Sequence, residues 1–276
     1  MTKLETRNQK PETSMPEAGQ IEYEFGVAIP GVIKPPEQWA RTALKRLPLE
    51  GPLNWEALFG RQAPVVVELG CGNGRYTLLS AVQRPAYDHF AGDVLAAAIR
   101  YATRRANQRG LHNVRFAVKD AEALVEKYLP PGSVAEIHLY HPQPFHDRRE
   151  ARRRLVKPGF LAGVYRALVP GGTFVVQTDC AEYWKYMKKV LPEFFRLQEQ
   201  DGPWSDAPEG RSRREIVARR RGLKIFRACC TRRDELTEEQ VAALVRTLPH
   251  PTFHSRPPPA GDERRKAKDE RSNCPA

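Results

Sequence analysis

The chain has no long hydrophobic run. Of its 276 residues 41% are hydrophobic, enough for a core, yet no apolar stretch approaches the roughly 20 residues that span a bilayer. The polar segment 1–20 lacks the apolar region of a secretory signal. We therefore expect neither a membrane span nor a signal peptide.

Cysteine is scarce, and its spacing shows no pairing. The five cysteines form no C-x-x-C motif; they are Cys71, Cys180, Cys229, Cys230 and Cys274. An odd number without such spacing argues against a zinc knuckle or a disulfide framework. We expect no metal site and a reducing, cytoplasmic environment.

Negative charge is in deficit: 33 acidic residues face 45 lysines and arginines, for a net charge of +12. This balance favours a polyanionic partner, nucleic acid first and an anionic membrane surface second. The arginines gather in two clusters, Arg148, Arg149, Arg152, Arg153 and Arg154, and Arg211, Arg213, Arg214, Arg219, Arg220 and Arg221. Basic tails that only aid solubility are the alternative. Because both clusters flank the predicted core, we favour nucleic-acid binding.

What the chain does have is a glycine-rich turn, V-V-V-E-L-G-C-G-N-G at residues 65–74. Its apolar start predicts a buried strand, and Gly70, Gly72 and Gly74 leave backbone amides bare for a ligand. A dinucleotide fingerprint would need its third glycine one residue later. Glu68, two residues before the first glycine, is instead placed as in sites that grip S-adenosylmethionine. A plain strand–turn–helix corner is the alternative interpretation.

Strands and helices alternate between residues 64 and 233. The expected strands are 65–69, 89–92, 114–118, 136–140, 173–178, 194–198 and 223–230, and the expected helices are 75–83, 96–109, 160–168 and 182–190. Repeated βα units predict an α/β, Rossmann-like fold, with a mostly parallel seven-stranded sheet covered by helices on both faces. The last two strands are separated by an Arg-rich loop without a clear helix, and they can add an antiparallel edge.

The segments outside this domain (64–233) differ in character. Residues 1–20 are expected to be a disordered tail. Residues 21–63 are expected to be an arm that packs on the core, extended over 21–36 and helical over 37–47 and 55–59. Residues 234–276 are expected to hold one helix, 236–248, followed by a disordered basic tail.

Acidic residues follow the predicted strands where a ligand would lie. Asp93 comes about 20 residues after the glycine turn, the spacing at which an acid meets ribose hydroxyls. Asp120 and Ala121 follow the next strand and would lie beside an adenine. Each of these acids alone is more often a solvated turn residue, but together at consecutive strand ends they favour a nucleoside site.

With these residues in place, the chain resembles the bacterial tRNA (guanine-N7)-methyltransferases over residues 65–233. The motifs that carry the resemblance are E-L-G-C-G-N-G, N-V-R-F-x-x-x-D-A, I-H-L-Y-H-P-Q-P-F, R-R-L-V-K-P-G-F-L, P-G-G, T-D and S-R-R-E. The resemblance implies the class I methyltransferase fold, S-adenosylmethionine as methyl donor, and N7 of a guanine in the tRNA variable loop as acceptor. It implies a cytoplasmic tRNA-modifying enzyme, expected to be a monomer or a homodimer.

The resemblance also assigns roles to individual residues. Cofactor positions fall on Glu68, Gly70, Gly72, Gly74, Asp93, Asp120, Ala121 and Gln143, and substrate or tRNA positions fall on Asp147, Asp179, Ser212 and Glu215. The basic clusters, rather than the resemblance, assign the tRNA backbone to Arg148, Arg149, Arg153 and Arg154. The chain departs from the family at its P-D-P-W motif. The proposed catalytic Asp is Gln143, the Trp is Phe145, and a substrate-contacting Lys is Asp147.

Gln143 does not exclude methyl transfer. N7 of guanine already has a free lone pair, so no base need deprotonate it, and orientation supplies much of the rate. Gln143 keeps an acceptor oxygen but lacks the charge that would stabilise the cationic product. Asp147 can compensate if the loop folds back, or it is an ordinary exposed Asp paired with arginines. His141 and His146 are expected to be solvated loop histidines, with contact to a phosphate or a base as the alternative. The alternative functions are methyl transfer to another acceptor and RNA binding without catalysis.

Overall fold

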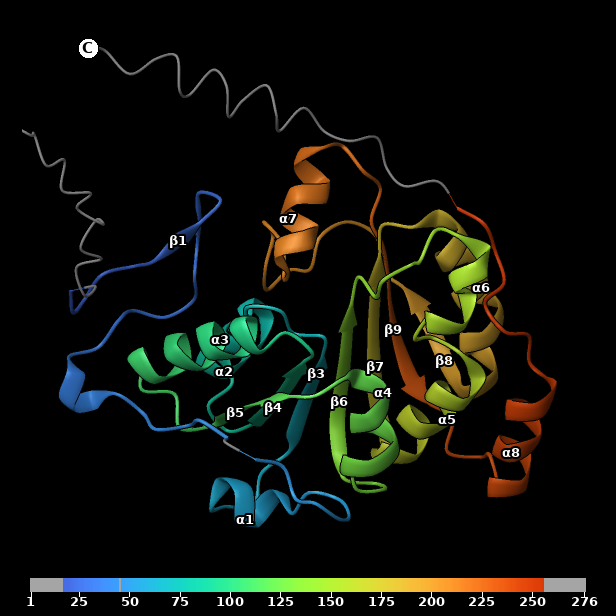
Figure 1. Cartoon of the computed structure of the whole chain (residues 1–276), viewed down its shortest axis with the longest axis horizontal. Coiled ribbons are helices and arrows are strands. Elements are labelled where there is room, and N and C mark those ends of the chain that lie inside the picture. Colours follow the sequence, from blue (N-terminus) through green and yellow to red (C-terminus); the bar gives the residue numbers. More distant parts are fainter. Residues whose placement is uncertain (1–16, 45, 256–276) are drawn as a thin grey trace, which may run out of the picture.

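A seven-stranded sheet forms the centre of the computed structural model, which describes residues 17–44 and 46–255. The strand order is β5-β4-β3-β6-β7-β9-β8 (Figure 1). The strands are β3 (Val65–Leu69), β4 (Asp88–Asp93), β5 (Val114–Val118), β6 (Val134–Tyr140), β7 (Leu168–Thr178), β8 (Phe195–Glu199) and β9 (Phe226–Arg232). Strands β3 to β7 pair in parallel, and β9 runs antiparallel to β7 and β8. The predicted mostly parallel sheet and its antiparallel edge are confirmed.

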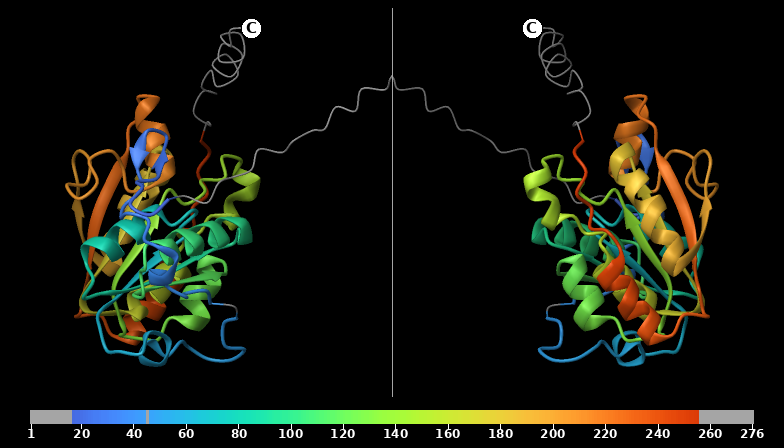
Figure 2. Two further views of the ribbon diagram at one scale, coloured as in Figure 1. Left: turned by 90° about the vertical axis from the view of Figure 1, so that its left-hand side faces the viewer. Right: turned by 90° about the vertical axis from the view of Figure 1, so that its right-hand side faces the viewer.

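Helices cover both faces of this sheet (Figure 2). They are α1 (Trp55–Phe59), α2 (Arg75–Gln83), α3 (Ala96–Gln108), α4 (Ala121–Ala123), α5 (Pro158–Ala167), α6 (Ala181–Phe194), α7 (Arg213–Arg220) and α8 (Glu238–Thr247). Shorter elements are the helices η1 (Pro36–Gln38), η2 (Leu124–Tyr128) and η3 (Arg148–Arg153) and the hairpin strands β1 (Tyr23–Glu24) and β2 (Val27–Ala28). Helices α2 and α3 pack against β4 and β5, whereas α5 and α6 pack together against β7.

Alternation along the central strands decides which side chains face which layer. Val65 and Val67 in β3 join the large apolar cluster beneath α5 and α6, as do Ile137 and Leu139 in β6. Val66 belongs instead to a smaller cluster on the α2 side. The polar residues of β6 therefore lie on the α2 side, below the carboxyl ends of the parallel strands.

The arm differs from its prediction over residues 37–47. Within the described residues 37–44 and 46–47, only the short helix η1 forms, and the chain then runs extended along the end of α3. The amide of Ala40 donates to the Asn107 carbonyl (2.9 Å), Thr42 bonds the Asn107 side chain (3.0 Å from its amide), and Ala43 forms a bridge beside Phe116. These backbone groups find their partners on the core, so the predicted helix was wrong.

The Arg-rich loop before β9 also differs from its prediction, because it contains the helix α7. The Ser212 side chain caps this helix by accepting from the Glu215 amide (3.1 Å). The S-R-R-E motif carries the S-x-x-E signal of a helix start, which the predominance of arginine obscured. The last strand begins at Phe226, three residues later than predicted.

Most of the predicted tails, 1–16 and 256–276, lie outside the described residues. Over the described part of the chain, no helix is both long enough and apolar enough to cross a membrane.

Candidate active site

The glycine turn after β3 is held open by its neighbour β4. The amides of Gly70 and Cys71 both donate to the Gly92 carbonyl (2.8 and 3.0 Å), and the Gly72 amide donates to the Asp93 carboxylate (2.9 Å). Gly70 and Gly72 have φ of 72° and 53°, and a Cβ on either would meet only open space. The turn thus presents bare backbone toward a free volume, as a ligand cradle requires.

Gly74 is needed for a different reason. A Cβ at this position would lie 2.8 Å from the Ala102 Cβ and 3.1 Å from the Phe116 ring. The third glycine therefore lets α2 pack closely on α3 and β5, whereas the first two face the cavity.

Glu68 is buried at the end of β3, where its carboxyl group caps α2. Both the amide and the hydroxyl of Thr77 donate to the same oxygen, the amide at 3.0 Å. Because Gly74 at the helix start has no side chain, this contact replaces an ordinary N-cap. Burial raises the pKa of Glu68 to about 8, against the partial opposing effect of the Thr77 hydrogen bonds.

A cavity of about 670 Å³ opens above the turn. Its lining combines Glu68, Gly70, Cys71, Gly72, Asn73, Arg75 and Tyr76 with Leu95, Ala97, Ala98, Tyr101, Tyr140, His141 and residues 211–214. Glu24, from the β1–β2 hairpin, completes it, and this carboxylate accepts from the Asn73 side chain (2.7 and 2.8 Å). Figure 2 shows the hairpin beside α7. The N-terminal arm is thus one wall of the site.

The other acids at the strand ends serve the loops around the cavity. Asp93 clamps the glycine turn and also accepts from the Leu95 amide (2.9 Å). Asp120 is exposed and caps α4 by accepting from the Ala123 amide (2.8 Å). Neither they nor Ala121 are among the cavity-lining residues. Their predicted contacts to a ribose and an adenine remain predictions.

The loop after β6 carries backbone strain. His141 and Phe145 both have positive φ, 51° and 41°, which is unfavourable for residues with a Cβ. The His141 amide donates to the Gln177 carbonyl (2.7 Å), and Arg154 donates to the carbonyls of Pro144 and Phe145 (both 2.7 Å). Gln143 lies between these two fixed points and is exposed.

The predicted solvated state of His141 was wrong, because its side chain is only 4% exposed. The Gln177 amide nitrogen donates to Nε2 (2.8 Å), so Nδ1 carries the proton and donates to Asp179 (3.0 Å). Arg214 contacts the second oxygen of Asp179 (2.6 Å). Although burial alone raises the pKa of Asp179, His141 and Arg214 together hold it well below its usual range.

Two predicted RNA-contacting residues are buried, which corrects their assignment. Arg154 is 0% exposed and donates to three backbone carbonyls, those of Pro144, Phe145 and Pro251. Glu215 is 0% exposed and pairs with Arg227 (2.5 Å). Both charged groups have their partners inside the fold and are not available to RNA. Arg154 positions the loop after β6, and Glu215 positions the start of α7.

The exposed arginines remain candidates for RNA contact. Arg148, Arg149 and Arg153 extend from η3, and Arg153 lies over the Phe145 ring (4.3 Å). Asp147 pairs with Arg149 (2.6 Å) and caps η3, which confirms the interpretation of an exposed Asp paired with arginines. Ser212 lines the cavity while capping α7.

Among the cavity residues that sequence reasoning missed are Glu24 in the arm and Tyr76 in α2, and it counted Arg211 only as a member of a basic cluster. Glu24 gave no signal, because the arm has no periodicity that links it to the glycine turn. Over the described residues, no group of His, Cys, Asp and Glu side chains could hold a metal ion.

Comparison with known proteins identifies the family. Residues 62–228 match the family model described as "Putative methyltransferase". The tRNA (guanine-N(7)-)-methyltransferase of Alkalilimnicola ehrlichii is 33% identical over 186 residues, covering 67% of this chain and 78% of the relative. The corresponding enzyme of Alcanivorax borkumensis is 34% identical over 187 residues, covering 68% and 77%.

A solved structure agrees on the fold. The 16S rRNA methyltransferase KamB superposes with a TM-score of 0.51 at 18% identity, covering 70% of this chain and 98% of that one. Its likeness concerns the fold alone, and the sequence relatives carry the closer assignment. The chain belongs to the tRNA (guanine-N7)-methyltransferase family.

Proposed function

We propose that this protein is a cytoplasmic, S-adenosylmethionine-dependent methyltransferase that acts on N7 of a guanine in the variable loop of tRNA. The observation that carries the proposal is the cavity at the strand ends, with a bare glycine turn as its floor and arginines on its wall. Its position is where open α/β sheets bind ligands, and the relatives named above bear this activity in their names.

The residues present fit S-adenosylmethionine. A cavity of about 670 Å³ is large enough for a nucleoside with an amino-acid side arm, and the absence of side chains at Gly70 and Gly72 admits it close to the backbone. Carboxyl groups of Glu24 and Glu68 line the cavity on the same side as the turn. We assign the ribose to Asp93 and the adenine to the neighbourhood of Asp120 and Ala121.

When bound, S-adenosylmethionine supplies an electrophilic methyl group on a sulfonium. The protein's task is then to hold a guanine with N7 in line with that methyl group. The strained 141–145 loop is the element that we assign to this task, since Arg154 and Gln177 fix its two ends. Gln143 offers an amide oxygen there, and Phe145 offers a ring face on which a base can stack.

Without a carboxylate at position 143, this site gives less electrostatic stabilisation to the positive charge that develops on the guanine. Loss of one such group typically costs about 100- to 1000-fold in rate. Asp179 follows the neighbouring strand β7, but its charge is shared between His141 and Arg214. We therefore expect a slower enzyme, in which binding and orientation supply most of the acceleration.

The exposed arginines of η3 and α7 are assigned to the tRNA backbone. Guanidinium groups bind phosphates in pairs of hydrogen bonds, which gives affinity and salt dependence but little sequence information. Selection of one guanine would then depend on the shape of the tRNA and on a base turned out of its stack.

The test is a methyl-transfer assay with the full chain, labelled S-adenosylmethionine and unmodified tRNA at low salt, followed by digestion to nucleosides. Labelled N7-methylguanosine supports the proposal, and Gln143→Asp should then raise the rate while Gln143→Ala lowers it. Label in a different nucleoside would establish another acceptor. Cofactor binding without any label on tRNA would instead favour an RNA-binding protein or another substrate class.

A further inference from the structure

Arg211 is the most rigidly held cation in the cavity wall. Its guanidinium lies over two aromatic rings, with its carbon 4.2 Å from the centroid of the Trp204 ring and 5.0 Å from that of the Tyr76 ring. Nε and Nη2 each donate to Asp206 (both 2.9 Å), and Nη1 donates to the Tyr140 hydroxyl (2.9 Å). A bidentate carboxylate and two adjacent rings leave the group little rotational freedom.

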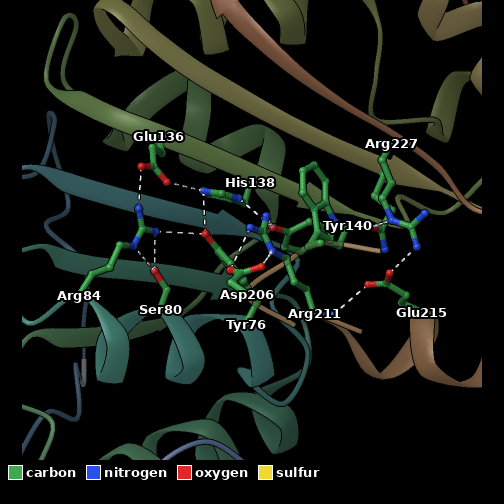
Figure 3. Close-up of polar contacts among 12 residues, drawn as sticks. Tyr76, Ser80, Arg84, Glu136, His138, Tyr140, Asp206, Arg211, Glu215 and Arg227 are labelled. Atoms are coloured by element: carbon green, nitrogen blue, oxygen red, sulfur yellow. Dashed lines mark hydrogen bonds and ion pairs between the residues drawn. The ribbon is translucent and has the colours of Figure 1, made fainter. Parts of the chain in front are cut away.

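A directed chain of hydrogen bonds supports Arg211 from within the sheet (Figure 3). Since arginine only donates, the Tyr140 hydroxyl accepts from Arg211 and gives its own proton to Nδ1 of His138 (2.8 Å). Nε2 of His138 then donates to Glu136 (2.9 Å), which also pairs with Arg84 (2.7 Å). Because the ionised Glu136 only accepts, Nε2 carries the proton, which also faces the Tyr76 hydroxyl (3.0 Å), and Nδ1 accepts from Tyr140.

The hydrogen bonds of His138 keep these directions because its imidazole ring stays neutral. Burial lowers the pKa of His138 to about 4, against the opposing effect of Glu136. The residue therefore carries one proton at neutral pH, on Nε2, and leaves Nδ1 free to accept.

The backbone of Arg211 is anchored as well. Its amide donates to Glu215 (2.9 Å), whose other oxygen pairs with Arg227 (2.5 Å). Arg227 in turn contacts the Gln177 oxygen (3.1 Å), which also accepts from the Trp204 indole (2.7 Å). The Trp204 ring and the Arg211 guanidinium are thus fixed by the same buried group of side chains.

This anchoring leaves unused donors on a charged group. Arginine has five N–H groups, and three of those on Arg211 have partners among the described residues. The remaining two, one on Nη1 and one on Nη2, have no partner among those residues and are available to an anionic acceptor such as a carboxylate. Its side chain is 13% exposed and lines the cavity.

The other arginines of the cavity are less suited to an anionic ligand. Arg75 is buried with Nη1 enclosed, and its Nη2 donates to the Ala28 carbonyl (2.8 Å). Arg213 lies over the Phe25 ring (4.9 Å), and Arg214 is paired with Asp179. Arg211 is the one that combines access, fixed geometry and free N–H groups beside Glu68 and Tyr76.

We propose that Arg211 binds the carboxylate of the amino-acid end of S-adenosylmethionine, and that the Tyr140–His138–Glu136 chain positions its guanidinium. The identity of this ligand rests on the proposed function. The placement agrees with the cavity, because Arg211 lines it together with Glu68 and Gly70, whereas Asp93 ends the neighbouring strand β4.

The test compares S-adenosylmethionine with its decarboxylated form, measured by isothermal titration calorimetry on the full chain. The wild type should bind the decarboxylated ligand about 10- to 100-fold more weakly, the range for hydrogen bonds to a charged group. Arg211→Met should reduce this ratio to less than about threefold, mainly by weakening binding of the intact cofactor. Arg211→Lys keeps the charge but loses the paired donors, so its ratio should be intermediate.

The control and the opposing outcomes separate the two proposals. Arg196→Met removes an equally positive charge from the exposed edge, where Arg196 pairs with Glu235 (2.9 Å), and should leave the ratio unchanged. Equal wild-type affinity for both ligands, or equal loss of both in the folded Arg211 variants, would overturn the assignment of Arg211. A wild type that binds neither ligand would contradict the proposed function itself. Thermal unfolding of each variant checks that it is folded, and if Arg211→Met is not, the ratio for Arg211→Lys decides.

Discussion

The buried carboxyl group of Glu68 makes a strong prediction about pH. Burial raises its pKa from 4.5 to about 8, so between these values the folded protein binds a proton that the unfolded chain has released. Stability contributed by the protonated group is therefore fully present below pH 4.5, and it is lost as pH rises through about 8. The difference between the two pKa values corresponds to about 5 kcal/mol of unfolding free energy, because each pKa unit is worth about 1.4 kcal/mol.

Glu68→Gln isolates this effect. Glutamine has the shape of the protonated acid and keeps an oxygen that can accept from Thr77, but it cannot ionise. The unfolding free energy of the variant relative to wild type should increase by about 1.4 kcal/mol per pH unit between pH 5 and 7.5, and then level off above about 8. Other titrating groups cancel in this difference, since both proteins carry them.

The measurement is urea unfolding of both proteins at pH 5 to 9 at constant ionic strength, with the m-values compared. Equal pH dependence of the two proteins would refute the reasoning, because it would mean that Glu68 is ionised in the folded state throughout. A matched control is Glu235→Gln, which removes an exposed carboxyl group and should not reproduce the trend.

Three further predictions concern the site. Binding of cationic S-adenosylmethionine beside Glu68 should lower its pKa and release a fraction of a proton at pH 7, detected by calorimetry in buffers of different ionisation heat; a binding heat independent of buffer would contradict this. Arg154→Met leaves buried carbonyls without a donor and should reduce the unfolding free energy by about 3 kcal/mol in urea, so a loss below about 1 kcal/mol would contradict the assigned role. Replacing Arg148, Arg149 and Arg153 by Gln should lower the slope of log affinity for tRNA against log salt by about 2, and an unchanged slope would exclude η3 from the interface.

Residue type and periodicity were sufficient to predict the fold class of this protein and its central sheet. The apolar run before the glycine turn predicted β3, and the repeated βα pattern predicted the sheet and its antiparallel edge. The first two glycines were correctly expected to leave bare backbone, because a positive φ at alternate turn positions is a local requirement. The motif order was enough to identify the family.

Only the tertiary structure decided which charged residues are available to a ligand. Arg153 and Arg154 are neighbours in one basic run, yet the first is exposed and the second is completely buried against three carbonyls. Glu24 lies outside the matched region and reaches the glycine turn only because the hairpin folds over it. The availability of a charge depends on partners that are distant in sequence, and the local sequence pattern does not contain that information. The local pattern determines secondary structure, through backbone sterics and alternating burial. The cavity and the fixed Arg211 arise instead from contacts that form when separate elements pack together.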